Sequence, residues 1–181
     1  MSEENASNRA FSSYAFISIG ANLPSANGSP AETIALAFDC IARLPSSGFL
    51  KSSIYSSTPV DSPAGTPDFL NAVAGIIPDD TETPLSLLHK LQAIENEAGR
   101  TRSGLKNEAR ILDLDLIVFG AVVCDTPELI VPHPRAQERR FVLEPLKRIV
   151  GEDFVLPGLS ESLQGLLLAI GDQQGIYKAR L

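Results

Sequence analysis

The chain has 181 residues, of which 44% are hydrophobic, and its 15 basic and 22 acidic side chains give a formal net charge of −7. This length can bury a sizeable core without disulfides. No apolar run approaches the roughly 20 residues that a membrane helix needs, so we expect no membrane span and no membrane partner. Residues 1–13 lack the basic and apolar parts of a secretory signal. We therefore expect a disordered tail over residues 1–13 and a single domain over residues 14–181.

The charges are distributed unevenly along the chain. Residues 1–99 hold 4 basic and 11 acidic side chains, residues 100–148 hold 9 and 7, and residues 149–181 hold 2 and 4. Nucleic-acid binding normally calls for a broad basic face, whereas one cationic region suits a small polyanion. Cys40 and Cys124 lack metal-site spacing, which favours reduced thiols in a cytoplasmic protein. A monomer is expected, with an oligomer left open.

The first half of the chain predicts a strand, a helix and two more strands. Residues 14–20 have the apolar alternation of a buried strand and run into a turn. Ser29 and Pro30 are typical of a helix start, and apolar residues then recur at helical spacing. Residues 49–58 and 69–77 have strand character on either side of a Pro-rich loop.

The second half begins with a helix that opens at Thr83–Pro84 and is closed by Gly99. A polar loop with four basic side chains follows over residues 100–110, and residues 111–119 form the clearest strand of the chain. A short hairpin is expected to return along residues 122–124. Two further helices are expected from Arg135 and from Ser160.

The order strand, helix, strand, strand, helix, strand predicts an α+β fold. We expect a two-layer ferredoxin-like sandwich, in which the helices pack on one face of a largely antiparallel sheet.

Two aspartates in the clearest strand give the strongest chemical signal. Because alternate side chains of a strand share a face, Asp113 and Asp115 point one way while Leu112, Leu114 and Leu116 enter the core. A strand with one wet face would show the same alternation. However, Asp is disfavoured in strands and like charges repel, so a compensating cation is expected. Oxygen ligands on a rigid strand suit Mg²⁺, particularly when substrate phosphates complete its octahedron.

Basic residues immediately precede these aspartates, at Arg100, Arg102, Lys106 and Arg110. A solvated loop is the simplest interpretation of such a run. Guanidinium groups also bind phosphate oxygens in a bidentate fork and stabilise charge during phosphoryl transfer. Arginines beside a Mg²⁺ site indicate a nucleoside triphosphate, although the usual Gly-rich phosphate loops are missing from the sequence.

A third cluster lies around His133, which stands between two prolines and is followed by Arg139, Arg140 and Phe141. The prolines hold the histidine in an extended segment, which favours a defined contact, although a structural histidine would satisfy the same pattern. His89, in the predicted second helix, is expected on the surface. With two histidines and two scattered cysteines, a zinc site or a Cys–His dyad is not expected.

Seven sequence blocks occur together in an order and spacing that resemble the 6-hydroxymethyl-7,8-dihydropterin pyrophosphokinases of folate biosynthesis. The blocks are Gly20–Leu23, Tyr55 with Thr58–Pro59, Pro67–Ala72, Gly99–Arg102, Arg110–Leu116, Val131–Arg135 and Arg139–Phe141. The resemblance implies transfer of a pyrophosphoryl group from MgATP to the hydroxymethyl oxygen of the pterin, with release of AMP.

The resemblance also implies roles for individual residues. Asp113 and Asp115 would hold two Mg²⁺ ions that bridge the triphosphate, and Arg100 and Arg110 would stabilise the transferring phosphates. The nucleotide contacts implied in the same way are Gln92, Arg102, His133 and Arg139. On the pterin side, Phe69 and Phe141 would stack on the two faces of the ring, Asn71 would read its polar edge, and Thr58 would also line the site. Periodicity alone would place both phenyl rings in the core.

This chain departs from the family pattern ahead of the aspartates, where many members have Trp-Gly-Pro and this sequence has Asn107-Glu108-Ala109. The change removes a stacking aromatic from the loop. Two other functions would account for part of the same sequence pattern. A different two-metal nucleotidyl or phosphoryl transferase would also use paired aspartates and arginines, and an RNA-binding sheet would share the order of elements. The latter would need exposed aromatics and a basic face on its central strands.

Overall fold

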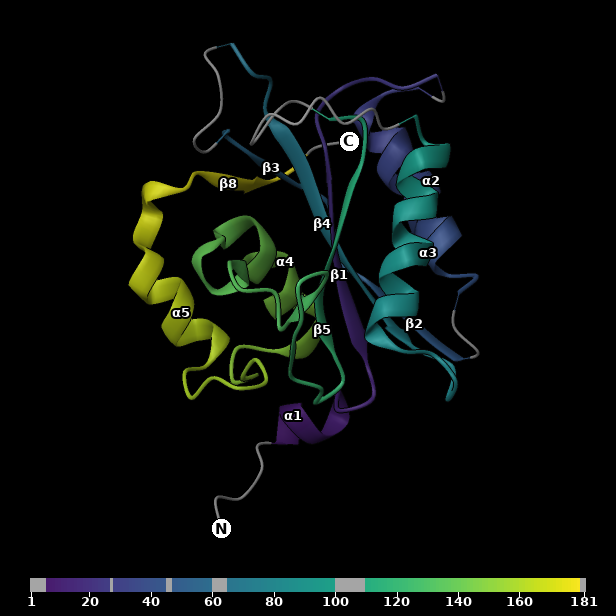
Figure 1. Ribbon diagram of the computed structural model, residues 1–181. Coiled ribbons are helices and arrows are strands. Elements are labelled where there is room, and N and C mark those ends of the chain that lie inside the picture. Colours follow the sequence, from purple (N-terminus) through teal and green to yellow (C-terminus); the bar gives the residue numbers. More distant parts are fainter. Residues whose placement is uncertain (1–5, 27, 45–46, 60–64, 100–109, 180–181) are drawn as a thin grey trace.

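The computed structural model describes residues 6–26, 28–44, 47–59, 65–99 and 110–179. At its centre is a six-stranded sheet with the order β5-β1-β4-β3-β8, in which β2 also pairs with β4 (Figure 1). All of its strand pairs are antiparallel. The strands are β1 (Ala15–Ala21), β2 (Ser47–Lys51), β3 (Tyr55–Ser57), β4 (Phe69–Ile77), β5 (Asp113–Phe119) and β8 (Ile176–Lys178).

Two helices cover one face of the sheet, as the sequence predicted. They are α2 (Pro30–Ile41) and α3 (Pro84–Glu97). Both begin as expected, because the side chains of Ser29 and Thr83 accept hydrogen bonds from backbone N–H groups of the first turn and a proline follows each cap. Together with β1, β2, β4 and β5 these helices form the predicted ferredoxin-like arrangement, which is confirmed. The expectation of two layers, with every helix on one face, is wrong.

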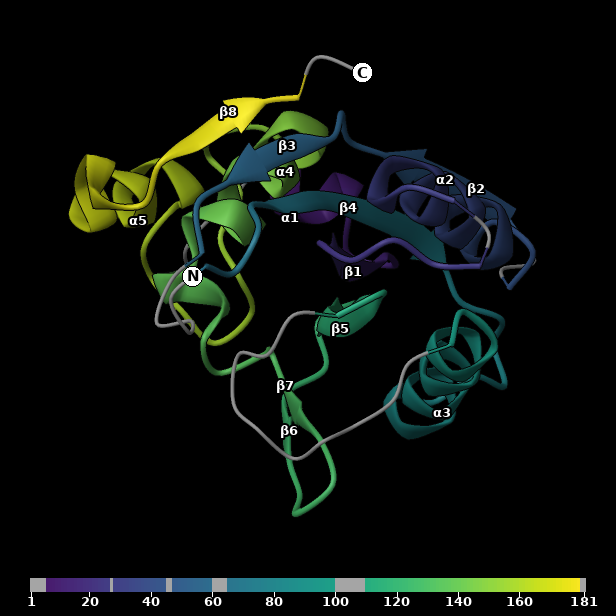
Figure 2. The same cartoon turned by 90° about the horizontal axis from the view of Figure 1, so that it is seen from above.

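A further layer of helices covers the opposite face, so that the sheet lies between two helical layers (Figure 2). This layer contains α4 (Arg140–Val150) and α5 (Leu163–Ile170), preceded by the 3-10 turn Ala136–Glu138. The sequence carried a sign of it, because the buried residues of β1 include neighbours that point to opposite faces of the sheet. Phe16 belongs to the core beneath α4 and α5, whereas Ala15 and Ile17 belong to the core beneath α2 and α3.

Residues 6–13 differ from the disorder expected for residues 1–13. Residues Ala6–Ala10 form helix α1. The amide of Asn8 exchanges two hydrogen bonds with the backbone of Val155, at 2.7 and 3.0 Å, and the ring of Phe11 packs against those of Phe16 and Phe154. The polar composition predicted a tail, but one aromatic ring and one amide are enough to attach this segment to the distant Val155 loop.

The prediction that the chain returns along β5 as a hairpin is wrong. Residues Cys124–Asp125 form β6, and this strand pairs with β7 (Ile130–Val131) instead of returning along β5. Helices α4 and α5 correspond to the two predicted C-terminal helices, although each begins a few residues later than expected. Cys40 and Cys124 are free thiols and partly buried, as expected for reduced cysteines. Within the described ranges, no helix is both long and apolar enough to cross a membrane.

Candidate active site

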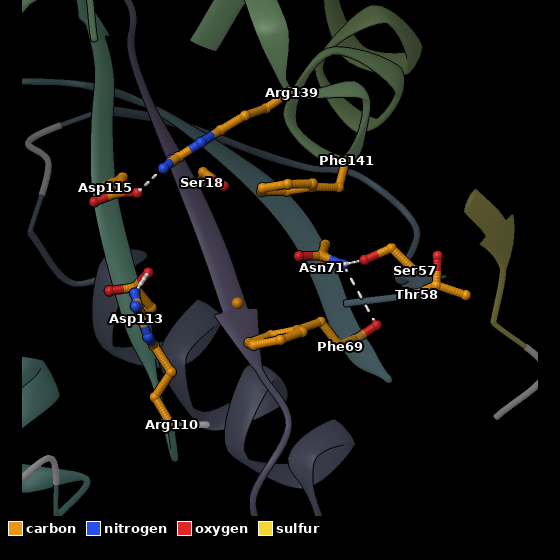
Figure 3. A pocket seen from close by; sticks show the side chains of 11 residues that line it. Ser18, Ser57, Thr58, Phe69, Asn71, Arg110, Asp113, Asp115, Arg139 and Phe141 are labelled. Atoms are coloured by element: carbon orange, nitrogen blue, oxygen red, sulfur yellow. Dashed lines mark hydrogen bonds and ion pairs between the residues drawn. The ribbon is translucent and has the colours of Figure 1, made fainter. Parts of the chain in front are cut away.

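A pocket opens on the sheet face that α4 covers, at the end of the strands beyond the helix N-terminus (Figure 3). Its side chains come from β1, β3, β4, β5 and the start of α4. The lining residues are Ser18, Gly20, Ser57, Thr58, Phe69, Asn71, Arg110, Asp113, Asp115, Arg139 and Phe141.

The floor of the pocket follows from strand register. In β1, Gly20 lies opposite Asn71 of β4 on one side and opposite Asp113 of β5 on the other, and Ser18 lies opposite Asp115. A Cβ atom built on Gly20 would stand 3.8 Å from the Asn71 amide oxygen and 3.9 Å from the Asp113 Cβ. Because the central strand contributes only small side chains here, the carboxylates on one side and the amide on the other face a common space.

Arg110 pairs with the first of the two aspartates, with its Nη1 atom 2.5 Å from Asp113 Oδ2. The backbone of Arg110 is fixed by Asn22, a buried residue just past the end of β1. Asn22 Oδ1 accepts a hydrogen bond from the Arg110 N–H at 2.8 Å, and the Arg110 carbonyl accepts one from the Asn22 N–H at 3.1 Å. The Asn22 side chain also donates to the Pro67 carbonyl at 3.1 Å. Asn22 therefore holds the guanidinium-bearing segment against the sheet.

Asp115 faces two basic groups from the other side of the pocket. Arg139 donates from Nη1 to Asp115 Oδ2 at 3.3 Å, and His133 Nε2 lies 4.0 Å from the same oxygen. Burial and the neighbouring Asp113 carboxylate raise the pKa of Asp115, even though His133, Arg139 and Arg110 act in the opposite direction. Among the described residues, the basic groups thus do not offset the effects of burial and of Asp113 on Asp115.

His133 has a defined orientation. Its Nδ1 accepts a hydrogen bond from the Arg135 N–H at 3.1 Å, so the neutral ring carries its proton on Nε2, the atom nearest Asp115. Burial lowers the pKa of His133, with Asp115 acting in the opposite direction. The His133 N–H in turn donates to the Ile117 carbonyl of β5 at 2.8 Å, at the point where the β1–β5 register shifts. The irregular strand therefore provides the anchor for the histidine segment.

The donor set fits Mg²⁺ bound together with phosphates. Two carboxylates side by side on a rigid strand, one of them with a raised pKa, form a site that a divalent cation would stabilise. In the part of the chain that the structure describes, no three His, Cys, Asp or Glu side chains group as a metal cage. The remaining ligands would then have to come from water or from a substrate, as is usual for Mg²⁺.

The other half of the pocket is an aromatic slot. The rings of Phe69 and Phe141 lie on opposite sides of a gap, with the Asn71 side chain at its edge (Figure 3). The Asn71 Nδ2 donates to Ser57 Oγ at 2.8 Å, an arrangement that directs the Asn71 oxygen away from Ser57. Both phenyl rings are only partly buried, unlike ordinary core residues. A flat heterocycle with polar edges would fit between them.

Most of the predicted site residues therefore converge. Thr58, Phe69, Asn71, Arg110, Asp113, Asp115, Arg139 and Phe141 line the pocket, and His133 lies beside it. Gln92 is on α3, in the helical layer on the opposite face of the sheet, and does not line the pocket. Arg100, Arg102 and the departure at residues 107–109 lie outside the described residues.

Sequence reasoning missed Glu95, a buried residue of α3. Its carboxylate accepts a hydrogen bond at 2.7 Å from the N–H of Leu114, the residue between the two aspartates. Glu95 lies four residues after Leu91, on the buried face of α3. The sequence signal for this residue was an acidic side chain at a position where the helical repeat predicts an apolar, buried one.

Comparisons with known proteins identify the family of the chain. The sequence profile of the family described as 7,8-dihydro-6-hydroxymethylpterin-pyrophosphokinase (HPPK) matches residues 16–151. The chain belongs to this family. Its membership confirms the resemblance and identifies an enzyme, a pyrophosphokinase of folate biosynthesis.

Three curated relatives illustrate the match. A 2-amino-4-hydroxy-6-hydroxymethyldihydropteridine pyrophosphokinase of Pseudomonas aeruginosa is 43% identical over 132 residues, which cover 72% of this chain and 76% of that protein. One of Haemophilus influenzae is 38% identical over 164 residues, covering 90% and 96%. The folic acid synthesis protein fol1 of Pneumocystis carinii is 38% identical over 153 residues, covering 80% of this chain and 19% of that larger protein.

Solved structures share the fold of this HPPK family member. The wild-type HPPK-DHPS of Plasmodium falciparum, crystallised with SDX-DHP, superposes with a TM-score of 0.61 at 13% identity. The match covers 84% of this chain and 43% of that one, so the chain spans less than half of that bifunctional protein. At this identity the likeness supports the ferredoxin-like fold alone.

Proposed function

We propose that this HPPK family member transfers the pyrophosphoryl group of ATP to the hydroxymethyl oxygen of 6-hydroxymethyl-7,8-dihydropterin. The oxygen would form a bond to the β-phosphorus and lose its proton to solvent. The bond between that phosphorus and the oxygen it shares with the α-phosphate would break, and AMP would leave with that oxygen. One observation carries the proposal: a single pocket joins a carboxylate pair with arginines to an aromatic slot with an amide.

The pterin would occupy the slot between Phe69 and Phe141. Offset stacking on two aromatic faces suits a flat bicyclic ring and contributes about 0.5–1.5 kcal/mol per ring pair beyond area burial. Asn71 would read the polar edge of the ring with its free oxygen, since Ser57 already takes one amide hydrogen. Thr58 would close the same end of the slot. This orientation leaves the hydroxymethyl group to extend along the floor toward Asp113 and Asp115.

The phosphates would lie over the opposite half of the pocket, where Asp113 and Asp115 would hold Mg²⁺. The bound metal would neutralise charge on the phosphates and orient them for in-line attack. Arg110 and Arg139, from opposite sides, would stabilise charge on the transferring group. We propose that His133, through its Nε2–H, contacts the nucleotide and that Gln92 reaches it from α3 past the edge strand β5. Arg100 and Arg102 would approach it from the preceding loop.

Positioning and charge neutralisation would account for most of the rate. A cation brought with the substrate would offset the burial and the Asp113 charge that raise the pKa of Asp115. The two halves of the pocket are joined by Ser18 and Gly20, so the distance between the pterin oxygen and the phosphates would be set by strand register.

The decisive test is release of AMP from ATP in the presence of Mg²⁺ and the pterin, with Asp113→Ala as the control. We expect AMP to appear only when the pterin is added and Asp113→Ala to be inactive. Products of ATP that form without the pterin would instead support another two-metal nucleotidyl or phosphoryl transferase. An inactive wild-type protein that binds RNA would contradict the proposal altogether.

We also propose that two Mg²⁺ ions act with one ATP, that the protein is a monomer and that it works in the cytoplasm. Titration of activity with Mg²⁺ at fixed ATP would separate one ion from two. Light scattering at assay concentration would determine the oligomeric state, and fractionation of cells that express the protein would test its location.

A further inference from the structure

The C-terminal segment, residues 171–178, lies against the pocket from outside the part of the chain that matches the family. The segment follows α5 and ends in β8, which pairs with β3 (Figure 1). Within it, the Gly175 carbonyl accepts a hydrogen bond from the N–H of Thr58 at 3.3 Å. Since Thr58 lines the pocket, this segment forms the outer support of one pocket wall.

The side chain of Gln174 bridges two backbone groups that flank Arg139. Its Oε1 accepts a hydrogen bond from the Arg140 N–H at 2.9 Å, and its Nε2 donates to the Glu138 carbonyl, also at 2.9 Å. One planar amide therefore holds the chain immediately before and immediately after Arg139.

This bridge supplies a cap that the helix otherwise lacks. Arg139 is the N-cap residue of α4 and makes no side-chain capping hydrogen bond. The first N–H groups of a helix have no partner within the helix, so an acceptor must come from elsewhere. Gln174 provides it from 34 residues further along the chain. Arg140 adds a second attachment, because its Nη1 donates to the Gly171 carbonyl at 2.5 Å and lies 3.1 Å from Asp172.

The residue that the bridge encloses is the one that reaches across the pocket. Arg139 has an extended backbone, with φ −112° and ψ 98°, and its guanidinium lies 3.3 Å from Asp115 and 5.7 Å from the centre of the Phe141 ring. The direction of a long side chain depends on its backbone, so a small shift at the Cα atom of Arg139 produces a larger displacement of the guanidinium. Loosening of the backbone on either side would therefore release the guanidinium from the phosphate half of the pocket.

We propose that Gln174 is a positioning residue of this enzyme, which fixes the backbone on both sides of Arg139 and so holds its guanidinium over the phosphate half of the pocket. The inference rests on the proposed function. The family match ends at residue 151, so this support is contributed by a part of the chain beyond the match.

Steady-state kinetics of Gln174→Met test the role, because methionine keeps the length of the side chain and removes both hydrogen bonds. We expect kcat/KM for ATP to fall roughly tenfold, with the affinity for the pterin changed less than about twofold. Gln174→Glu keeps the acceptor for the Arg140 N–H but not the donor to the Glu138 carbonyl. Its kcat/KM for ATP should lie between those of the wild type and Gln174→Met. The matched control is Lys178→Ala in the same segment, which changes an exposed residue of β8 and should leave activity unchanged.

A double-mutant cycle with Arg139→Ala distinguishes positioning from general support of the fold. If Gln174 acts through Arg139, Gln174→Met should change kcat/KM for ATP by less than about twofold once Arg139 is alanine. An undiminished tenfold loss in that background would overturn the inference, as would a wild-type rate in the single variant. The wild-type assay separates the two proposals: a wild-type protein without pterin-dependent AMP release contradicts the proposed function, whereas an active wild type with an unaffected Gln174→Met contradicts only the positioning role.

Discussion

One face of the central sheet has two ends with opposite character. Beneath α4, the three central strands present Phe16, Val73 and Ile117, all fully buried in the core. Beyond the start of α4, the same face of the same strands presents Ser18, Asn71 and Asp115. The boundary runs through the row in which Ser18 lies opposite Val73 on one side and opposite Asp115 on the other.

The two ends serve different purposes. The apolar end contributes free energy of folding because its side chains leave water completely. The polar end holds two carboxylates close together, and the raised pKa of Asp115 shows that the ionised form is disfavoured there. Substitutions at the apolar end should therefore lower stability and leave the chemistry intact, and substitutions at the polar end should impair the chemistry without lowering stability.

The largest effect is expected for Asp115→Ala. Removing a metal ligand should lower turnover by more than about a thousandfold, since Mg²⁺-bound phosphates would lose part of their support. AMP release at saturating Mg²⁺ measures the loss. Asp125→Ala, at an exposed residue of β6, is the matched control and should have the wild-type rate. An unchanged rate for Asp115→Ala would remove this residue from the metal site.

Leu146→Ala should have the opposite profile. Leu146 is completely buried on the core-facing side of α4, so the substitution leaves a cavity and should lower the free energy of unfolding by about 2–5 kcal/mol. Denaturant titration gives the change, and Leu168→Ala, at a side chain that is 71% exposed, is the control. The fraction that remains folded should turn over at the wild-type rate. A selective loss of turnover would show that the two ends of the sheet face are not independent.

Arg110→Ala is expected to lower turnover about a hundredfold while it changes pterin affinity much less, because the guanidinium would act on charge that develops during transfer. Kinetics combined with calorimetry of pterin binding separate the two quantities. Arg43→Ala, an exposed arginine after α2, controls for the loss of one positive charge. Weakened pterin binding with normal turnover would show that Arg110 acts on the pterin and not on the transferring phosphates.

The smallest effect is a gain in stability. The pKa of Asp115 is higher in the folded protein than in the unfolded chain, so the unfolded chain ionises first as pH rises. The free energy of unfolding therefore falls as pH rises from the unfolded-state pKa to the folded-state pKa. Asp115→Asn should therefore stabilise the metal-free protein at neutral pH, by less than for a fully buried carboxyl because the side chain is 34% exposed and partly screened. The difference should vanish below about pH 4. Thermal unfolding in a chelator across this range measures it, and a difference independent of pH would rule out ionisation as the cause.

The elements of the ferredoxin-like half could be predicted because their signals are local. The caps at Ser29 and Thr83 and the alternation around Asp113 and Asp115 are visible within a few residues. The site was partly predictable for the same reason, since strand alternation alone sets the aspartates side by side. The phenyl rings could not be assigned by periodicity, because a ring that lines a slot and a ring in the core occupy the same face.

What escaped prediction depends on contacts between distant parts of the chain. The α4–α5 layer, the attachment of α1 through Asn8 and the β6–β7 pairing all involve partners that no local pattern specifies. Glu95 and Gln174 belong to the same class, because each acts on a backbone group of another element. Nothing in the neighbourhood of either residue in the sequence indicates which group it will meet.

The position of β1 also bears on how the molecule is made. This strand is the earliest of the sheet to leave the ribosome, yet it lies between β4 and β5, which follow it by roughly 50 and 90 residues. At about 5–20 residues per second, several seconds would pass before either edge of β1 meets a partner. During that interval an apolar strand with both edges unpaired is exposed to other chains. The central position of β1, which places Ser18 and Gly20 in the middle of the pocket, therefore also makes this strand dependent on protection during synthesis.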